Sequence, residues 1–247
     1  MSGYVDFIVA GAQKSGTTAM RHFLSAHPQI GMPRADITEP HYFSRRYKTA
    51  QPGNYAPYHA LYDDVGLAKV TCDVTPIYVY LRGCLERAHA YNPDMKVVVI
   101  LRNPVDRAYS QWNMERRRGK ETRSFLSALA HELWVWGREG QHPVYSYLQR
   151  GLYARQIRHL TSVFPEDQCK FIKHEDFKSN YAETLKGVFA FLGVNVNVPI
   201  PAWQSIHTQD YKAMPKATRL LLRQFFSADI RQTEALLGWD CTDWRRS

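Results

Sequence analysis

Two short apolar runs constrain the fold of this chain more than any other feature. Residues 5–10 read VDFIVA and residues 96–101 read KVVVIL, and both runs are rich in β-branched residues and nearly unbroken by charge. Hydrophobicity that is continuous, rather than alternating, is typical of strands in a parallel sheet that is covered on both faces. We therefore expect an α/β fold with a central parallel sheet flanked by helices on both faces.

Helical patterns alternate with the strands along the chain. We expect helices at residues 17–26, 78–91, 104–118, 124–136, 147–164, 176–192 and 216–237, and weaker strands at 68–74 and 168–174. Asn103 is a good N-cap for the third of these helices, and Pro104 suits its first position. The alternation indicates a single doubly wound, P-loop-like domain over residues 1–247. Segments 33–65 and 194–214 read as irregular, and long loops of this kind are usually lids or binding segments.

Composition narrows the class of ligand and the cellular setting. The formal net charge of +9 points towards anionic ligands such as nucleotides, nucleic acid, acidic polysaccharide or a membrane surface, with general solubility as an equal alternative. The four cysteines (Cys72, Cys84, Cys169, Cys241) lack zinc-ligand spacing, so we expect reduced thiols and no metal. No apolar stretch approaches the roughly 18 residues of a membrane span. A strand begins almost at the first residue, so we expect no signal peptide and a cytoplasmic protein.

The loop after the first strand has the composition of an anion site. Residues 11–18 read GAQKSGTT and connect the end of a predicted strand to the start of a predicted helix, where backbone N–H groups and the helix dipole favour negative charge. The loop supplies two glycines for close approach, one lysine charge and three hydroxyl donors: Gly11, Gly16, Lys14, Ser15, Thr17 and Thr18. The alternative is an ordinary tight turn.

The same loop differs from the Walker A pattern of nucleoside triphosphate-binding proteins. That pattern places its lysine directly after the second glycine, followed by Ser or Thr that binds Mg²⁺. Here Lys14 comes two residues before Gly16. A triphosphate with its metal is therefore a poor fit, and a phosphate beside a sulfate is a better one.

A second anion site is indicated by LRNPVDRAYS at residues 101–110. Arg102 follows a predicted parallel strand at its carboxyl end, where α/β sheets bind ligands, and Ser110 lies two turns into the next helix. The guanidinium offers a planar fork of donors for phosphate. The alternative is that Arg102 pairs with Asp106. Two anion sites at neighbouring strand ends suggest one ligand with two anionic ends.

Taken together, these stretches resemble the sulfotransferases that use 3′-phosphoadenosine-5′-phosphosulfate (PAPS). GAQKSGTT is similar to the 5′-phosphosulfate loop of that family, and LRNPVDRAYS is similar to its 3′-phosphate segment. TEPHYF at 38–43, TPIY at 75–78, RGLY at 150–153 and the C-terminal LLGWDCTDW resemble segments of the heparan sulfate 3-O- and N-sulfotransferase branch. The resemblance covers nearly the whole chain.

The resemblance implies a role for each matching position. Lys14 would contact the bridging oxygen between phosphate and sulfate, and the 150–153 segment would pass near the adenosine. The remaining cofactor contacts are implied for Ser15, Gly16, Thr17 and Thr18 at the 5′ phosphate, for Arg102 and Ser110 at the 3′ phosphate, and for Tyr153 in the adenosine segment. The product would be adenosine 3′,5′-bisphosphate (PAP), and no metal would be required.

The resemblance also implies the catalytic groups. Glu39 in TEPHYF would be the general base, and His41 would support it or contact the acceptor. A carboxylate suits this task because the acceptor hydroxyl must lose its proton as the new S–O bond forms. Without the family pattern, Glu39 reads as a solvated loop carboxylate and His41 as a packed or surface histidine.

One position departs from the family pattern. The heparan-type enzymes carry a lysine directly before the TPxY segment and a glutamate before that lysine, and this chain has Val74 and Asp73 there. Lys212, in the second irregular segment, is a candidate for a replacement contact to the nucleotide. The basic run RRYK at 45–48 is a candidate contact for an anionic acceptor.

These patterns favour a PAPS-dependent sulfotransferase that acts on a hydroxyl or amine of a small-molecule or glycan acceptor. Segments 33–65 and 194–214 are expected on the acceptor side. Two other classes stay open. One is a P-loop nucleotide kinase or NTPase, and the other is a non-catalytic binder of acidic glycan or nucleic acid, which the positive charge alone would permit. No RRM, KH or helix-turn-helix signature supports nucleic acid as a partner.

Overall fold

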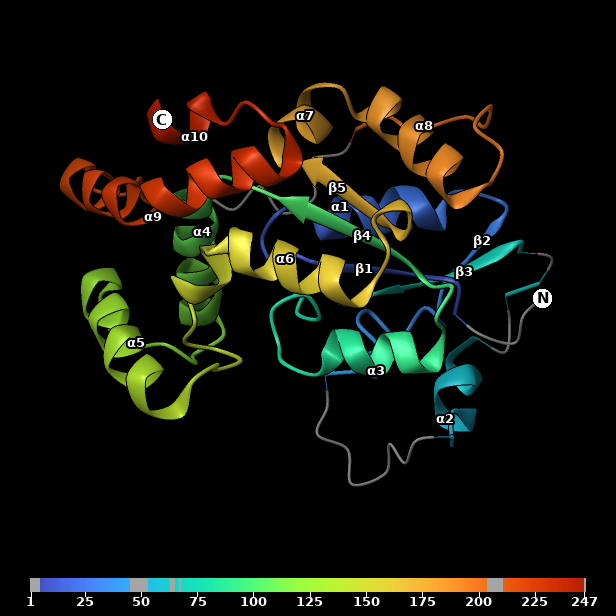
Figure 1. Ribbon diagram of the computed structural model, residues 1–247, viewed down its shortest axis with the longest axis horizontal. Coiled ribbons are helices and arrows are strands. Elements are labelled where there is room, and N and C mark those ends of the chain that lie inside the picture. Colours follow the sequence, from blue (N-terminus) through green and yellow to red (C-terminus); the bar gives the residue numbers. More distant parts are fainter. Residues whose placement is uncertain (1–4, 45–52, 63–64, 67, 204–210, 247) are drawn as a thin grey trace. The chain divides into compact units, whose positions relative to one another are not determined.

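The computed structural model describes residues 5–44, 53–62, 65–66, 68–203 and 211–246 (Figure 1). In chain order its elements are β1 (Phe7–Gly11), α1 (Thr17–Ser25), β2 (Ile30–Gly31), α2 (Ala56–His59), η1 (Ala60–Tyr62), β3 (Val70–Val74), α3 (Cys84–Tyr91), β4 (Lys96–Leu101), α4 (Pro104–Arg117), α5 (Phe125–Glu139), η2 (Gln149–Gly151), α6 (Tyr153–Val163), η3 (Glu166–Gln168), β5 (Cys169–Lys173), α7 (His174–Ser179), α8 (Tyr181–Leu192), α9 (Lys216–Leu237) and α10 (Thr242–Arg246), where η marks a 3₁₀ helix.

The five strands form one sheet in the order β2-β3-β1-β4-β5. The pairs β1–β3, β1–β4 and β2–β3 are parallel, and Val9 of β1 lies beside Val74 of β3 and Val98 of β4. Because these strands run in one direction, the ends of β1, β3 and β4 lie at the same edge of the sheet. The prediction of an α/β fold with a central parallel sheet is confirmed.

The continuous apolarity of β1 and β4 follows from burial on both faces. Val9 and Val98 point into a cluster that includes Phe23 of α1 and residues of α8, while the alternate positions, such as Ile8 and Val97, are equally buried on the other face. Figure 1 shows α1 and α8 on one side of the sheet and α3 on the other. Helices therefore cover both faces, as the strand composition requires.

Several predicted helix boundaries are wrong, and each error has a local cause. The helix expected from residue 78 begins only at Cys84, because Gly83 adopts a left-handed φ of +75° and residues 75–83 form turns. The helix expected from residue 147 is preceded by η2 and begins at Tyr153, whose N–H is bound by Asp229 at 2.7 Å. The helix expected over 176–192 divides into α7 and α8 at Asn180.

Short elements were missed where sequence periodicity is too brief to detect. Strand β2 has two residues, and α2 with η1 interrupts the segment that we expected to be irregular from 33 to 65. Helix α10 at the C-terminal end was also not predicted. In the described part of the chain no helix is long and apolar enough to cross a membrane. All four cysteines are free thiols.

By their internal contacts the residues group into two compact units. The first comprises Met1–Ile100 with Leu160–Ile206, and the second comprises Leu101–His159 with His207–Ser247. The first unit carries the sheet with α1, α3, α7 and α8, and the second carries α4, α5, α9 and α10. The expected single domain stays a prediction, and the two units are described separately below.

The second unit is organised around buried polar side chains. Arg107 of α4 is fully buried and donates to Gln111 and to the carbonyl oxygen of Tyr147. Glu132 of α5 accepts the backbone N–H groups of Leu148 and Gln149 at 2.6 and 2.9 Å. These bonds fix the turn between α5 and α6.

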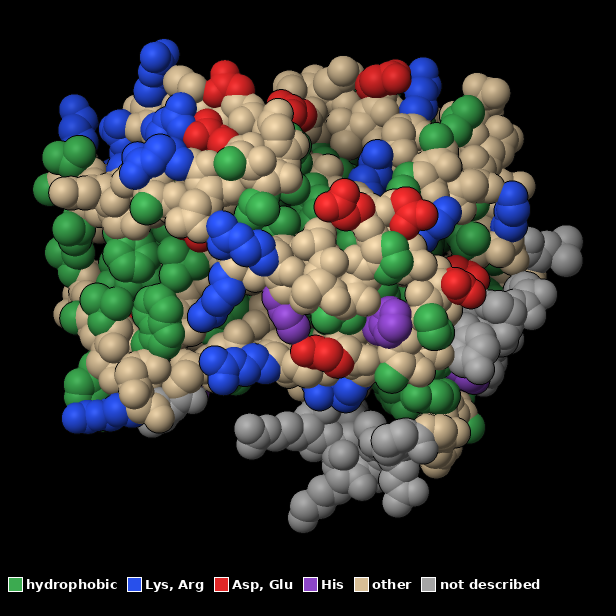
Figure 2. Space-filling model, in the orientation of Figure 1, with side chains coloured by type: hydrophobic (Ala, Val, Ile, Leu, Met, Phe, Trp, Pro, Cys, Tyr) green, Lys and Arg blue, Asp and Glu red, His purple; other side chains and the backbone are tan. Residues whose placement is uncertain are grey.

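Helix α5 also presents an apolar stripe to solvent. Leu126, Leu133 and Trp134 are about half exposed, at spacings that place them on one side of a helix. Figure 2 shows hydrophobic side chains gathered over this helix. The Arg138 guanidinium lies 4.2 Å from the centre of the Trp134 ring, so a cation covers part of the indole.

Candidate active site

The loop between β1 and α1 is held in a compact turn at the carboxyl end of the sheet. The Ala12 N–H donates to the carbonyl of Ile100 at 2.7 Å, and the Ser15 N–H donates to the carbonyl of Ala12 at 3.1 Å. Lys14 has a φ of +72° and Gly16 a φ of +96°. A left-handed lysine is uncommon, and backbone strain of this kind concentrates at ligand-binding sites.

The main evidence that this loop fits an anion is a buried hydroxyl group without a hydrogen-bond partner. Ser15 is completely buried, and its Oγ has no hydrogen-bond partner among the described residues. The N-cap of α1 is Gly16, which has no side chain to cap the first-turn N–H groups. Thr17 is buried, Thr18 is exposed and Lys14 is half-buried beside them. Buried donors without partners at a helix N-terminus are what a phosphate or sulfate oxygen would satisfy.

His174 supports the loop from the start of α7, and sequence reasoning missed it. Its Nδ1 lies 3.0 Å from the carbonyl oxygen of Ser15. A Cβ at Gly16 would lie 2.9 Å from the same nitrogen, so the glycine is needed for close packing as well as for its positive φ. The signal that could have found it was its place as the last residue of the strand predicted at 168–174, where α/β sheets bind ligands.

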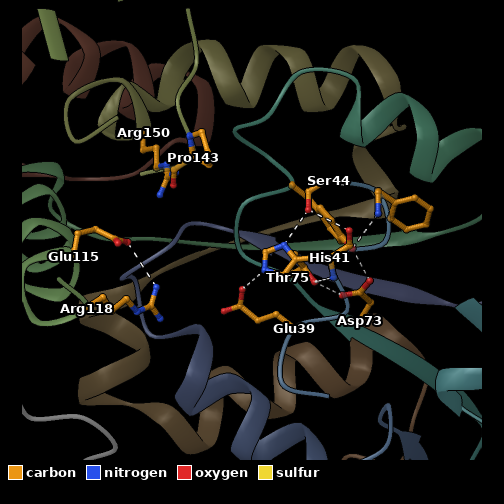
Figure 3. Close-up of polar contacts among 11 residues, drawn as sticks. Glu39, His41, Ser44, Asp73, Thr75, Glu115, Arg118, Pro143 and Arg150 are labelled. Atoms are coloured by element: carbon orange, nitrogen blue, oxygen red, sulfur yellow. Dashed lines mark hydrogen bonds and ion pairs between the residues drawn. The ribbon is translucent and has the colours of Figure 1, made fainter. Parts of the chain in front are cut away.

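Glu39 and His41 form a pair on the segment before residue 45 (Figure 3). Nε2 of His41 lies 3.0 Å from Oε2 of Glu39, and the side chains are 34% and 36% exposed. Because a carboxylate only accepts hydrogen bonds, Nε2 carries the proton of this contact. Nδ1 lies 2.9 Å from the Ser44 hydroxyl. One oxygen of a half-exposed Glu39 is thereby held by a histidine, and its other oxygen is available to an acceptor.

The backbone of His41 is anchored to the end of β3. His41 has a φ of +57°, and its N–H donates to Oγ1 of Thr75 at 3.2 Å. Thr75 donates in turn to Oδ1 of Asp73 at 2.6 Å. Asp73 is completely buried, and this burial raises its pKa to about 6 against the lowering effect of the hydroxyl groups that bond to it. The TPIY motif thus contributes to the placement of the candidate base.

Val74 lies on the opposite face of β3 from Asp73. It is 3% exposed and belongs to the apolar cluster that includes Ala19 and Met20 of α1. The side chain at the position of the family lysine therefore joins the hydrophobic core in this protein.

In the second unit, the segment after β4 has a fixed backbone. The carbonyl of Arg102 accepts a hydrogen bond from the Tyr153 hydroxyl at 2.7 Å. Asn103 caps α4 as predicted, by accepting the Val105 N–H at 3.0 Å. Tyr153 is 1% exposed, so its observed contact is with the backbone of Arg102, and its contact with a cofactor stays a prediction.

Three further positions of the second unit bear on the predicted 3′-phosphate segment. Ser110 lies on α4 and is 6% exposed. Asp106, the alternative partner of Arg102, forms an ion pair with Arg219 of α9 at 2.7 Å. Lys212 is exposed, and its carbonyl accepts the Tyr109 hydroxyl at 2.9 Å, which anchors its backbone to α4.

Part of the predicted acceptor side lies outside the described residues. This holds for the RRYK run at 45–48 and for residues 49–52, 63–64 and 204–210 of the two irregular segments. Within the described ranges there is no group of three His, Cys, Asp or Glu side chains that could hold a metal ion.

Comparisons with curated proteins point to one family. The model of the family described as sulfotransferase domain matches residues 5–234. Human heparan sulfate glucosamine 3-O-sulfotransferase 6 is 32% identical over 213 residues, which are 85% of this chain and 58% of that protein. The human bifunctional heparan sulfate N-deacetylase/N-sulfotransferase 2 is 24% identical over 76% of this chain and 22% of its own length. The chain thus spans little more than half of the first of these relatives.

Comparisons with solved structures agree. The crystal structure of a sulfotransferase from Alicyclobacillus acidocaldarius is 31% identical, with a TM-score of 0.83 and coverage of 98% of both chains. A mouse sulfotransferase complexed with PAP is 19% identical, with a TM-score of 0.50, and covers 80% of this chain and 61% of that chain. The second of these likenesses shows the fold alone.

Proposed function

The chain belongs to the sulfotransferase domain family, and on that premise we propose that it transfers the sulfuryl group of PAPS to a hydroxyl or amine acceptor and releases PAP. The observation that carries this proposal is the buried, unpartnered hydroxyl of Ser15 beside the N-terminus of α1. A doubly charged group at this place would satisfy donors that are costly to leave buried without a partner.

The loop residues have distinct tasks in this proposal. Ser15, Gly16, Thr17 and Thr18 bind the 5′ phosphate through hydroxyl and backbone N–H donors. Lys14 lies beside them on the same loop and donates to the oxygen that joins phosphate to sulfate. That oxygen gains negative charge as its bond to sulfur breaks, so Lys14 stabilises the transition state more than the ground state.

Arg102 and Ser110 have the 3′ phosphate as their proposed ligand, with Lys212 as an additional contact to the nucleotide. Asp106, the alternative partner considered for Arg102, forms its ion pair with Arg219. The Tyr153 hydroxyl supports the proposed ligand task of Arg102, since it fixes the backbone of that residue. An arginine whose backbone is already fixed loses less conformational freedom when its guanidinium binds a phosphate.

Glu39 is the proposed general base. Its carboxylate takes the proton from the acceptor hydroxyl as the new O–S bond forms. His41 donates to one of its oxygens at 3.0 Å, which orients the carboxylate so that the other oxygen faces the acceptor. When PAPS is bound, it supplies the sulfur electrophile and a phosphate leaving group, and this chemistry requires no metal.

For the acceptor we propose a hydroxyl or amine of a glycan or small molecule. The human 3-O-sulfotransferase 6 is named for the glucosamine units of heparan sulfate, which is an anionic sugar polymer. The net charge of +9 on this chain suits an anionic acceptor of that kind. The cytoplasmic location expected from the sequence is likewise a proposal.

The two other classes explain fewer features. A nucleotide kinase would need a lysine after Gly16, and this chain has its lysine at position 14. A non-catalytic binder of nucleic acid or acidic glycan would have no use for a carboxylate held by a histidine, as Glu39 is held by His41.

The test uses the whole chain with PAP and with labelled PAPS. We expect calorimetry to show PAP binding that Lys14→Ala weakens by about tenfold or more, which is the loss of one charge-assisted hydrogen bond. The matched control is Lys178→Ala, an exposed lysine of α7, which should bind PAP like the wild type.

Transfer of labelled sulfate to a panel of sugars, phenols and lipids then identifies the acceptor class. An ATP- and Mg²⁺-dependent activity would indicate a kinase. Steep salt dependence of binding without PAP retention would indicate a polyanion binder. Absence of both PAP binding and transfer would overturn the proposed function.

A further inference from the structure

Asp73 is a buried carboxylate that takes no direct part in the proposed chemistry. It is 0% exposed, and among the described residues no lysine or arginine is paired with it. It accepts hydrogen bonds from the hydroxyl groups of Thr75 at 2.6 Å, Tyr58 at 2.7 Å and Tyr78 at 2.9 Å. Burial of a carboxylate without a cation is costly. Packing alone would favour an apolar side chain at this position. The free-energy cost of burying the Asp73 carboxylate therefore indicates that it has a task besides packing.

Two of the three hydroxyl groups also hold the segment that carries His41. Oγ1 of Thr75 accepts the His41 N–H at 3.2 Å, and the hydroxyl oxygen of Tyr78 accepts the Phe43 N–H at 3.3 Å. A hydroxyl has one proton to donate. Because Asp73 takes that proton in both cases, the lone pairs of Thr75 and Tyr78 are left to face the backbone N–H groups. The carboxylate therefore sets the direction of both bonds.

The segment needs such anchoring because its conformation is unfavourable alone. The φ of His41 is +57°, in the left-handed region that non-glycine residues rarely adopt. Arg87 of α3 adds a third anchor, since its Nε donates to the Phe43 carbonyl at 2.8 Å. Held in this way, the imidazole lies between Glu39 and Ser44 (Figure 3).

We propose that Asp73 is a positioning residue, which fixes the backbone of residues 41–43 through Thr75 and Tyr78 and thereby aims His41 at the general base Glu39. The inference rests on the proposed function and names a residue of the same site that touches neither acceptor nor cofactor. Figure 3 shows the chain of contacts from Asp73 through Thr75 and His41 to Glu39. Its last link sets the direction of the carboxylate that takes the proton.

The protonation of Asp73 is consistent with this task. Burial raises its pKa to about 6, and the hydrogen bonds from Thr75, Tyr58 and Tyr78 oppose that rise. At neutral pH the group is therefore mostly ionised and accepts all three hydroxyl protons. A neutral side chain at position 73 would donate a hydrogen bond to one of these hydroxyl groups. The lone pairs of that hydroxyl oxygen would then turn away from the backbone N–H group that it accepts in the present structure.

The test compares two substitutions that break the chain of contacts at different points, made singly and together. Asp73→Asn keeps the size but introduces an amide donor, Thr75→Val keeps the shape but removes the acceptor of the His41 N–H, and the double variant combines them. We expect each single variant to lower kcat by about tenfold to a hundredfold, the effect of a misplaced catalytic group. KM for PAPS and the affinity for PAP should stay at wild-type values.

Because the two residues act through one chain of contacts, the double variant should lose little more kcat than Thr75→Val alone. Independent losses that multiply in the double variant would overturn the proposal. So would wild-type kcat in Asp73→Asn or Thr75→Val when both are folded.

The matched control is Tyr58→Phe. Tyr58 of α2 donates to Asp73 as the other two do, and no backbone N–H of residues 41–43 is bonded to its hydroxyl. This variant should lose stability but retain kcat. If it lowers kcat as much as Thr75→Val, the cluster serves stability only and the proposal is wrong.

A readout that needs no activity separates this proposal from the proposed function. The ring proton resonances of His41 can be recorded by NMR at one fixed pH in the wild type, Asp73→Asn and Thr75→Val. A displaced imidazole loses its contacts with Glu39 and Ser44, so its ring chemical shifts should change in both variants and stay unchanged in Tyr58→Phe. Failure of sulfate transfer in the wild type would overturn the proposed function, whereas unchanged His41 ring shifts in all variants would overturn the positioning role.

Discussion

Nε2 of His41 lies 3.0 Å from Oε2 of Glu39, although the two residues belong to a segment with no helix or strand. A contact of this kind on an irregular segment requires that the backbone be held from outside. The bonds from the His41 and Phe43 N–H groups to Thr75 and Tyr78 provide that support. The pair is therefore a property of the folded first unit and not of its local sequence.

Glu39→Gln should abolish most of the chemistry while leaving cofactor binding intact. The amide keeps the size of the side chain but cannot take a proton, so we expect kcat to fall by about a hundredfold or more. PAP affinity, measured by calorimetry, should be unchanged. Glu166→Gln, an exposed glutamate of η3, is the matched control and should keep full activity. Wild-type kcat in Glu39→Gln would remove this residue as the base.

Ser15→Ala should have opposite effects on stability and on binding. In the ligand-free protein, its buried hydroxyl has no partner in the described part of the chain. Its removal should therefore raise the free energy of unfolding by about 1 kcal/mol. PAP affinity should fall by about tenfold, because the same hydroxyl is the proposed donor to the phosphate. Urea unfolding with and without PAP measures both effects, and equal PAP affinity in the two proteins would count against the loop as the phosphate site.

Gly16→Ala should destabilise the protein by more than its backbone conformation alone explains. The new Cβ would lie 2.9 Å from Nδ1 of His174, in addition to the cost of a left-handed residue, which is about 1–2 kcal/mol. Gly193→Ala is the control, since Gly193 has a φ of +73° and open space around it. The difference between the two variants in urea unfolding isolates the clash. PAP affinity should fall in Gly16→Ala only.

Burial of Glu132 should make stability fall as pH rises towards neutrality. Burial raises the pKa of this carboxyl from 4.5 to about 7. Between these values the folded protein binds the proton more tightly than the unfolded chain does, so protonation of Glu132 adds to the free energy of unfolding. This added stability is fully present below pH 4.5 and is lost as pH rises through 7. The full effect is about 3 kcal/mol.

The free energy of unfolding should be measured across this pH range for the wild type and Glu132→Gln. The slope in the variant should be smaller, because glutamine does not titrate. Asp73, whose pKa burial raises from 3.8 to about 6, contributes in the same direction in both proteins. Equal slopes in the two proteins would show that Glu132 is not responsible.

The elements that were predicted correctly carry strong local signals. Strand β4 was expected at 96–101 and α9 at 216–237, and both occur at those bounds. In β4 the signal is an unbroken apolar run, and in α4 it is Asn103 followed by Pro104. The boundaries that were wrong, such as the start of α3 at Cys84, depend on the left-handed turn at Gly83, which hydrophobic periodicity does not reveal.

The amino-acid sequence by itself determined the parallel α/β fold and the loop with Lys14 and Ser15, because apolar runs and turn residues act over a few neighbouring positions. The candidate base Glu39 came from the resemblance of TEPHYF to a family segment and from no local signal of its own. Only the tertiary structure decided that Asp73 is a buried acceptor of three hydroxyl groups and that Thr75 holds the backbone of His41. Those contacts join side chains that are distant in sequence, and they exist because packing of α2, β3 and the segment around His41 excludes water from a carboxylate that would otherwise be solvated.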